Sequence, residues 1–179
     1  MMVNSDKLIS FLILIYLGSP VRSAGQTDAS GYPVLEIGTQ SSNIFGKDSS
    51  GVIHSLHSVE SKNILLFFYE TSCHFCEAIL PEMKEKYPEW KKKGYEIYAL
   101  PLNKDFEGWQ AQIREQKSDW INVTDTVNTE QIRQAYKITV TPTIYVLDEK
   151  RKIASTRLVR PEAIDEWISL HSENIIQKK

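Results

Sequence analysis

The spacing of apolar residues changes abruptly near the middle of this chain, and the change marks a strand that leads directly into a helix. Residues 64–69 form an unbroken apolar run, several of them aromatic, which is typical of a strand buried on both faces. From Cys76 onward the apolar residues follow helical spacing. This spacing predicts a helix from Cys76 through Tyr87 that resumes after Pro88 and stops at Gly94, a residue suited to a left-handed cap.

The remaining pattern predicts strands that alternate with helices. A polar turn over residues 46–51, between two short apolar segments, indicates a hairpin near the N-terminal end. Further along the chain we expect strands over 95–100, 140–147 and 152–158 and a short apolar connector over 120–125. We also expect three helices: one over 106–117, one capped by Asn128 or Thr129, and one that begins at Pro161. This order predicts an α/β fold with a central mixed β-sheet flanked by helices and an N-terminal β-hairpin extension.

Residues 1–23 are interpreted as a secretory signal peptide. Lys7 precedes an apolar run over residues 8–17 that is short for a membrane span, and cleavage is expected after Ser23. The alternative is an uncleaved N-terminal membrane anchor, because Lys7 is the only basic side chain before the apolar run. Either interpretation predicts an exported protein.

The rest of the chain is expected to form one domain with a small negative net charge. Residues 24–31 are polar and are interpreted as a flexible lead-in, and residues 32–179 have the length of a single domain. The whole chain has a formal net charge of −2, which becomes −3 when residues 1–23 are removed. This balance argues against nucleic acid or an anionic membrane surface as a partner.

Two cysteines, Cys73 and Cys76, lie where the predicted strand meets the helix. Unpaired backbone N–H groups and the helix dipole favour a thiolate at this place, so Cys73 is the expected nucleophile and Cys76, one turn further in, the resolving thiol. A zinc half-site would need two more ligands, and the chain offers only histidines for them, so we expect no metal. Two cysteines are also too few for a disulfide scaffold.

Three features in order resemble the thioredoxin superfamily. They are the pair Cys73 and Cys76 after an apolar strand, Pro81 five residues later, and Thr141-Pro142 before another strand. The N-terminal hairpin and the connector that begins at Trp120 resemble the TlpA and ResA group of exported, often membrane-anchored, bacterial thiol–disulfide oxidoreductases. The resemblance implies a thioredoxin-like fold, a cis Thr141–Pro142 bond, and no cofactor.

The resemblance also suggests how a substrate is held. The backbone N–H and C=O of Thr141, turned outward by a cis Pro142, would pair with an extended substrate chain. Phe75 is either a surface aromatic that packs on the helix start or a platform for an apolar partner segment. His74, if protonated, would stabilise the Cys73 thiolate and make the disulfide more oxidising.

The chain departs from the family pattern in its proton-handling residues. Phe67 stands where thioredoxins place a buried aspartate, Ser72 where they have a tryptophan, and Ile79 where TlpA-like reductases often carry a glutamate. Glu70 and Glu77 are the nearest carboxylates to the cysteines, and either is a candidate proton acceptor as well as an ordinary solvated side chain.

We predict an exported enzyme, most simply a periplasmic one, that reduces disulfides in other proteins. It would receive its electrons from a thiol–disulfide donor in the membrane. A peptide-binding module on the same fold is one alternative, although it would not need both Cys73 and Cys76. A peroxiredoxin-like peroxidase is another, but it would place threonine three residues before the reactive cysteine, where this chain has Glu70, with Thr71 one residue later. Whether the site acts as reductant, oxidant or isomerase stays open at this point.

Overall fold

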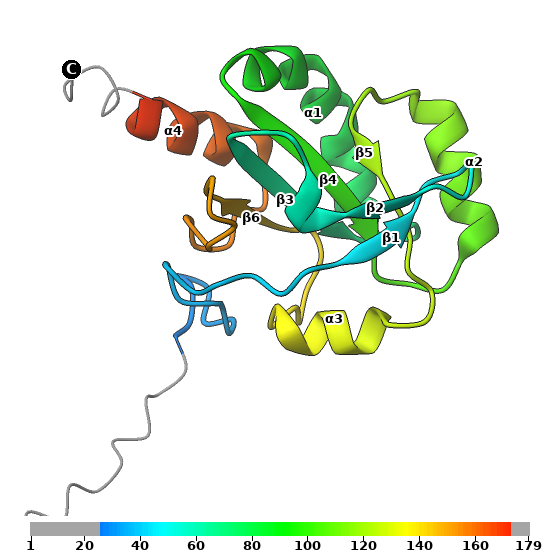
Figure 1. Ribbon diagram of the computed structural model, residues 1–179, viewed down its shortest axis with the longest axis horizontal. Coiled ribbons are helices and arrows are strands. Elements are labelled where there is room, and N and C mark those ends of the chain that lie inside the picture. Colours follow the sequence, from blue (N-terminus) through cyan, green and yellow to red (C-terminus); the bar gives the residue numbers. More distant parts are fainter. Residues whose placement is uncertain (1–25, 173–179) are drawn as a thin grey trace, which may run out of the picture.

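The computed structural model describes residues 26–172, and its centre is a four-stranded sheet in the order β5-β4-β3-β6. The strands are β3 (Asn63–Tyr69), β4 (Tyr95–Pro101), β5 (Ile121–Asn122) and β6 (Thr143–Leu147). Strand β3 pairs parallel with β4 and antiparallel with β6, and β4 pairs parallel with β5. The sheet is therefore mixed, as predicted (Figure 1).

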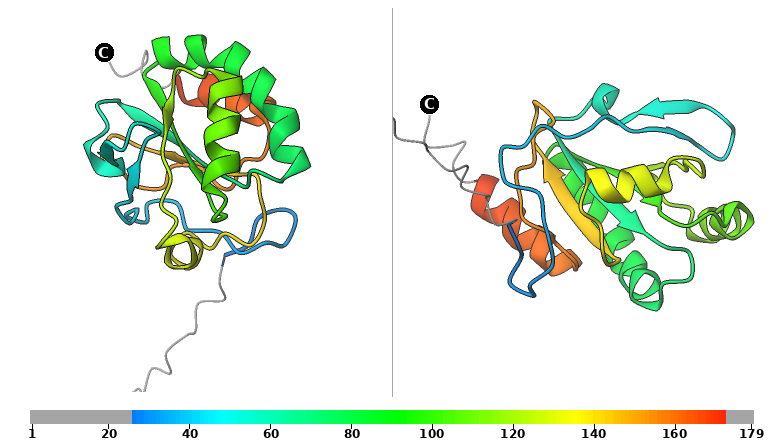
Figure 2. Two further views of the ribbon diagram at one scale, coloured as in Figure 1. Left: turned by 90° about the vertical axis from the view of Figure 1, so that its right-hand side faces the viewer. Right: turned by 90° about the horizontal axis from the view of Figure 1, so that it is seen from below.

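Helices cover both faces of this sheet (Figures 1 and 2). Leu65 and Phe67 of β3 contact the cluster that holds the inner faces of α1 (His74–Lys92) and α4 (Pro161–Ser172), together with Trp109 of α2 (Phe106–Gln116). Leu66 and Phe68 point to the opposite face, toward α3 (Thr129–Ala135) and the N-terminal segment. Because both faces of β3 are covered, its apolar residues do not alternate with polar ones.

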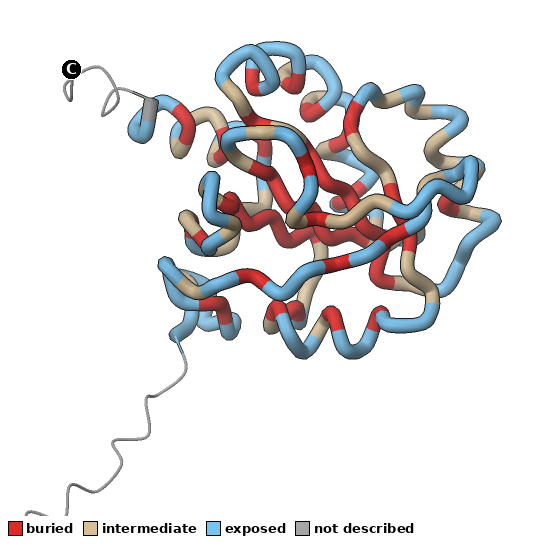
Figure 3. Tube along the Cα trace, viewed as in Figure 1, coloured by how far each residue is buried: buried red, intermediate tan, exposed pale blue. Residues whose placement is uncertain are grey.

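The burial pattern agrees with this arrangement. Buried positions concentrate along the central strands and on the inner sides of the helices, whereas the hairpin and the helix surfaces are exposed (Figure 3). Residues 64–69 are all buried, which confirms the interpretation of the apolar run.

The predicted N-terminal hairpin is present. Strands β1 (Phe45–Lys47) and β2 (Ile53–Ser55) pair antiparallel as a separate two-stranded sheet, followed by a short 3-10 helix at Leu56–Ser58. Asp48 closes the turn, because one carboxylate oxygen accepts N–H donors from Ser50 and Val52 and the other contacts the His54 ring at 2.8 Å. The hydroxyl of Ser50 and the His54 ring hold the pKa of Asp48 well below its usual range.

The helix after the cysteines is longer than predicted. Helix α1 begins at His74, two residues before the expected start, and continues without interruption past Pro88 to Lys92. The early start follows from Cys73, whose sulfur accepts the N–H of Cys76 and so acts as the N-cap. The helix continues through Pro88 because Tyr87 and Trp90, on either side of it, are buried against the sheet.

Residues 152–158 were expected to form a strand, and this prediction is wrong. The segment runs beside β6 but pairs with it only through isolated bridges at Ile153 and Leu158. The hydroxyl of Ser155 accepts the N–H of Val146 at 2.9 Å, so a side chain takes the place of a backbone partner and the regular ladder is broken. The connector over 120–125, by contrast, contributes the two-residue edge strand β5.

The described part of the predicted lead-in makes defined contacts with the domain. Residues 26–31 form a turn held on the domain, because Asp28 accepts N–H donors from Ser30 and Tyr32 and pairs with Arg157 at 2.6 Å. The predicted signal peptide lies outside the described residues. Among residues 26–172, no helix has both the length and the apolar character needed to cross a membrane.

Candidate functional site

The two cysteines meet at the end of β3 and the start of α1. They form a disulfide with their Cα atoms 5.2 Å apart. Cys73 is partly buried, whereas Cys76 is completely buried beneath it. The Cys76 N–H points at the Cys73 sulfur at 3.2 Å, and the positive end of the helix dipole lies at the same place. On reduction, both features favour the thiolate of Cys73 over that of Cys76.

The segment Thr141-Pro142 lies beside Cys73 because of the strand register. Thr143, the first residue of β6, is opposite Phe68 near the end of β3, so the residues before β6 face the loop that carries the cysteines. The Thr141–Pro142 peptide bond is cis. The Thr141 carbonyl oxygen lies 3.7 Å from the Cys73 sulfur, although the two residues are 68 positions apart in sequence.

Glu70, a candidate proton acceptor, is held in an ion pair. The guanidinium of Arg133 in α3 donates to the Glu70 carboxylate and, at 3.1 Å, to the carbonyl of Leu102 after β4. Both side chains of the pair are partly exposed, at 23% for Arg133 and 34% for Glu70. The pair ties the loop before the cysteines to two other parts of the fold, which gives Glu70 a structural partner.

Thr71 anchors the same loop to the start of α2. Its N–H donates to the Asn103 side chain at 3.3 Å, and its hydroxyl contacts Asn103 at 2.6 Å and Asp105 at 3.1 Å. Asp105 in turn caps α2 by accepting the N–H of Gly108 at 2.9 Å. The hydroxyl of Thr71 is therefore directed toward α2.

The other predicted site residues lie on the surface around the disulfide. His74 and Phe75 are both exposed, Phe75 by 74%, with ring centroids 6.1 Å apart. Glu77 is exposed on the first turn of α1. Phe67 is fully buried and stacks on Tyr69, so the position of the missing aspartate is apolar. Around the disulfide the structure thus brings together Cys73, Cys76 and Thr141, with the aromatic and charged side chains at the rim.

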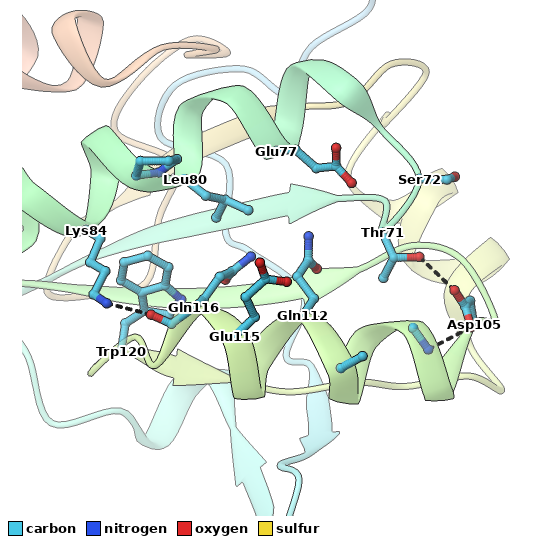
Figure 4. Close-up of a pocket in the computed structure, with 13 residues that line it drawn as sticks. Thr71, Ser72, Glu77, Leu80, Lys84, Asp105, Gln112, Glu115, Gln116 and Trp120 are labelled. Atoms are coloured by element: carbon cyan, nitrogen blue, oxygen red, sulfur yellow. Dashed lines mark hydrogen bonds between the residues drawn. The ribbon is translucent and has the colours of Figure 1, made fainter.

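A cleft opens next to this centre, between α1 and α2 (Figure 4). Its volume is about 710 Å³, and Thr71 and Ser72, the two residues before Cys73, form one end of it.

The family follows from comparison with known proteins. Residues 37–156, about two thirds of the chain, match the AhpC/TSA family. The chain belongs to the AhpC/TSA family. Among curated relatives, this AhpC/TSA protein is 28% identical over 156 residues to the thiol-disulfide oxidoreductase ResA of Bacillus cereus, covering 85% of the chain and 87% of the relative. It is 25% identical to the ResA of Geobacillus thermodenitrificans, covering 94% and 92%.

Solved structures agree with the sequence comparison. A domain of a possible thiol-disulfide isomerase from Cytophaga hutchinsonii has a TM-score of 0.72 and 28% identity, covering 81% of this AhpC/TSA chain and 99% of that domain. The thioredoxin domain of a thiol-disulfide oxidoreductase from Bacteroides vulgatus has a TM-score of 0.68 and 26% identity, covering 75% and 99%. These similarities confirm the thioredoxin-like fold and the resemblance to the ResA group.

Sequence reasoning missed the residues that position the cysteine loop. Asp105 could have been found, because an aspartate directly before a helical pattern is a standard N-cap signal. Arg133 could not, because it lies 63 residues from Glu70 and nothing in its local sequence distinguishes it from a surface arginine.

Proposed function

We propose that this AhpC/TSA-family protein is a thiol–disulfide oxidoreductase that reduces disulfide bonds in other exported proteins. The observation that carries the proposal is the Cys73–Cys76 pair itself. One sulfur is partly exposed at the helix N-terminus, and the other is buried one turn below it, within bonding distance. A nucleophile that a substrate can reach and a sheltered resolving thiol are the two parts that thiol–disulfide exchange requires.

The reaction proceeds by two exchanges. The Cys73 thiolate attacks one sulfur of the substrate disulfide, which forms a mixed disulfide and releases the other substrate sulfur as a thiolate. The Cys76 thiolate then attacks the Cys73 sulfur, so the Cys73–Cys76 bond forms and the second substrate thiolate leaves. The substrate gains two electrons and, from solvent, two protons, while this protein is oxidised. A thiol–disulfide donor in the membrane is proposed to restore the dithiol.

Neighbouring groups are assigned supporting roles in this reaction. The Thr141 backbone lies beside Cys73, where it can pair with an extended substrate segment, and Phe75 offers an exposed apolar contact. His74 follows the nucleophile directly and, when protonated, would stabilise its thiolate. Because Glu70 is already paired with Arg133, Glu77 is the better placed of the two candidate proton acceptors.

Two features support the choice among related functions. The signal peptide predicted over residues 1–23 supports an exported location, with the periplasm as the compartment and an uncleaved anchor as the alternative. Thr71 stands two residues before Cys73 and its hydroxyl is engaged by Asn103 and Asp105, which disfavours a peroxidase.

The test measures thiols released from a protein disulfide, such as insulin, by the pre-reduced protein in single turnover. We expect the wild type to release them and Cys73→Ser to release none. Ala78→Ser, at an exposed site on the same helix, is the matched control and should behave as wild type. A reduction potential near −270 mV would mark a reductase, and one near −120 mV an oxidant. Release by Cys73→Ser, or peroxide consumption without disulfide reduction, would overturn the proposal.

A further inference from the structure

The cleft between α1 and α2 starts at the cysteine loop and is lined by both apolar and polar side chains. Its apolar lining comes from both helices and the following connector, at Leu80, Pro81, Ala111 and Trp120. Its polar lining includes Glu77 on α1 and Glu115 on α2, which face the space between the helices from opposite sides (Figure 4). The cleft thus joins an apolar surface to two carboxylates, beside a disulfide.

The charges of this cleft are unbalanced toward the acidic side. Its one basic side chain, Lys84, donates to the carbonyl of Gln116 at 2.6 Å at the end far from the cysteines. Asp105 is occupied by its bonds to Thr71 and Gly108. The carboxylates of Glu77 and Glu115 form no ion pair or side-chain hydrogen bond with any residue that the structure describes.

A further acceptor lies between the two carboxylates. The side-chain oxygen of Gln112, which also lines the cleft, is buried and accepts no hydrogen bond from residues 26–172. The carboxylates of Glu77 and Glu115 and the side-chain oxygen of Gln112 together offer several acceptors. The donors left in the lining, such as the Gln112 amide N–H group, are uncharged. A cationic group with several N–H donors, the head group of lysine or arginine, has the chemistry that this arrangement lacks.

We propose that this cleft binds a lysine or arginine side chain that is close in sequence to the target cysteine of the substrate. The charged head of the side chain would meet Glu77 and Glu115, and the apolar lining at Leu80 and Trp120 would lie beyond it, on the side of the cleft away from the cysteines. The inference rests on the proposed function, since it assigns a substrate class to the same site. It implies that disulfides flanked by basic residues are reduced in preference to those flanked by acidic ones.

The distances agree with this assignment. Glu77 is four residues after Cys73, which corresponds to about 6 Å along the helix axis. In an extended substrate, a residue two or three positions from the target cysteine lies about 7–10 Å from it. A long basic side chain at that place spans the gap to the cleft while the target sulfur contacts Cys73.

The experiment compares three peptides that differ only beside a single cysteine, which carries 5-thio-2-nitrobenzoate as a mixed disulfide. The residues two and three positions from the cysteine are lysine, glutamine or glutamate. The rate of thionitrobenzoate release by the pre-reduced protein at low salt gives the second-order rate constant for each peptide. We expect the lysine peptide to react about tenfold faster than the glutamine peptide, as two partly exposed ion pairs predict, with the difference reduced at high salt.

The decisive measurement is the ratio of the release rate from the lysine peptide to that from the glutamine peptide, compared between the wild type and variants that change the charge of Glu77 and Glu115. Glu77→Gln with Glu115→Gln should bring this ratio close to one, and the lysine replacements Glu77→Lys with Glu115→Lys should favour the glutamate peptide. The matched control is Glu85→Gln with Glu107→Gln, which removes the same charge from the same two helices at exposed sites outside the cleft. The control should keep the wild-type ratio.

The outcomes separate this inference from the proposed function. An equal fall in the ratio for cleft and control variants would show a general effect of net charge and would overturn the inference. A wild type that reduces all three peptides at one rate would overturn it too, while leaving the proposed function in place. A uniform loss of rate on all peptides in Glu77→Gln, with the ratio kept, would make Glu77 a proton acceptor and not a specificity residue. Reduction of no peptide would refute both.

Discussion

Replacing Arg133 with methionine should destabilise the domain by loosening the loop before Cys73. The guanidinium joins three parts of the fold, since it lies in α3 and donates to the Glu70 carboxylate and to the carbonyl of Leu102. Methionine keeps the aliphatic length of the side chain and removes both interactions. The prediction also concerns catalysis, because it assigns Glu70 to this structural pair and not to proton transfer.

The magnitude follows from the exposure of the partners. With the two side chains 23% and 34% exposed, the ion pair contributes about 0.5–1 kcal/mol to the free energy of unfolding. The bond from a charged donor to the Leu102 carbonyl adds about 1–1.5 kcal/mol. We therefore expect Arg133→Met to lower the free energy of unfolding by about 2 kcal/mol, or the Tm by about 4–8 °C. Glu70→Gln should cost only about 0.5–1 kcal/mol.

The assay is chemical denaturation of the wild type, both single variants and the double variant. A double-mutant cycle should give a coupling free energy of about 0.5–1 kcal/mol between Arg133 and Glu70. Arg114→Met, at an exposed site on α2, is the control and should change the free energy of unfolding by less than about 0.5 kcal/mol.

Two results would refute this reasoning. Additive single effects would show that the pair contributes nothing, whatever its geometry. A large loss of reduction rate in Glu70→Gln, absent in Arg133→Met, would show that the carboxylate handles protons during exchange.

Three further predictions concern the site, the hairpin and the core. In cells, Cys76→Ser should accumulate mixed disulfides with substrate proteins, visible as reductant-sensitive gel bands, whereas Cys73→Ser should trap little; the reverse would exchange their roles. Because the pKa of Asp48 is lowered in the folded state, its carboxylate stabilises the fold at pH values above the unfolded pKa of about 3.9. The difference in free energy of unfolding between wild type and Asp48→Asn, measured by denaturation at several pH values, should therefore shrink as the pH falls below about 4. A difference that does not change with pH would contradict this. Met83→Ala, at a fully buried site on α1, should cost about 2–5 kcal/mol on denaturation, against less than about 0.5 for the exposed Glu85→Ala.

The sequence by itself determined the elements whose signal is local. The apolar run over 64–69, the two cysteines and the helical spacing after them follow one another directly in sequence, so periodicity was enough to predict β3 and α1. The position of the cysteines at the helix start also predicted that Cys76 is the more buried of the two. The hairpin around Asp48 followed from turn residues between short apolar segments in the same way.

Only the tertiary structure decided which distant groups meet. Thr141 contacts Cys73 across 68 residues because β6 pairs antiparallel with β3, and Arg133 reaches Glu70 across 63 because α3 packs on the sheet. Residues 152–158 have strand-like composition, yet the Ser155 hydroxyl replaces a backbone acceptor, and composition does not report such a contact. The cleft between α1 and α2 likewise exists only because these two consecutive helices are placed side by side, so its acidic lining could not be read from either helix alone.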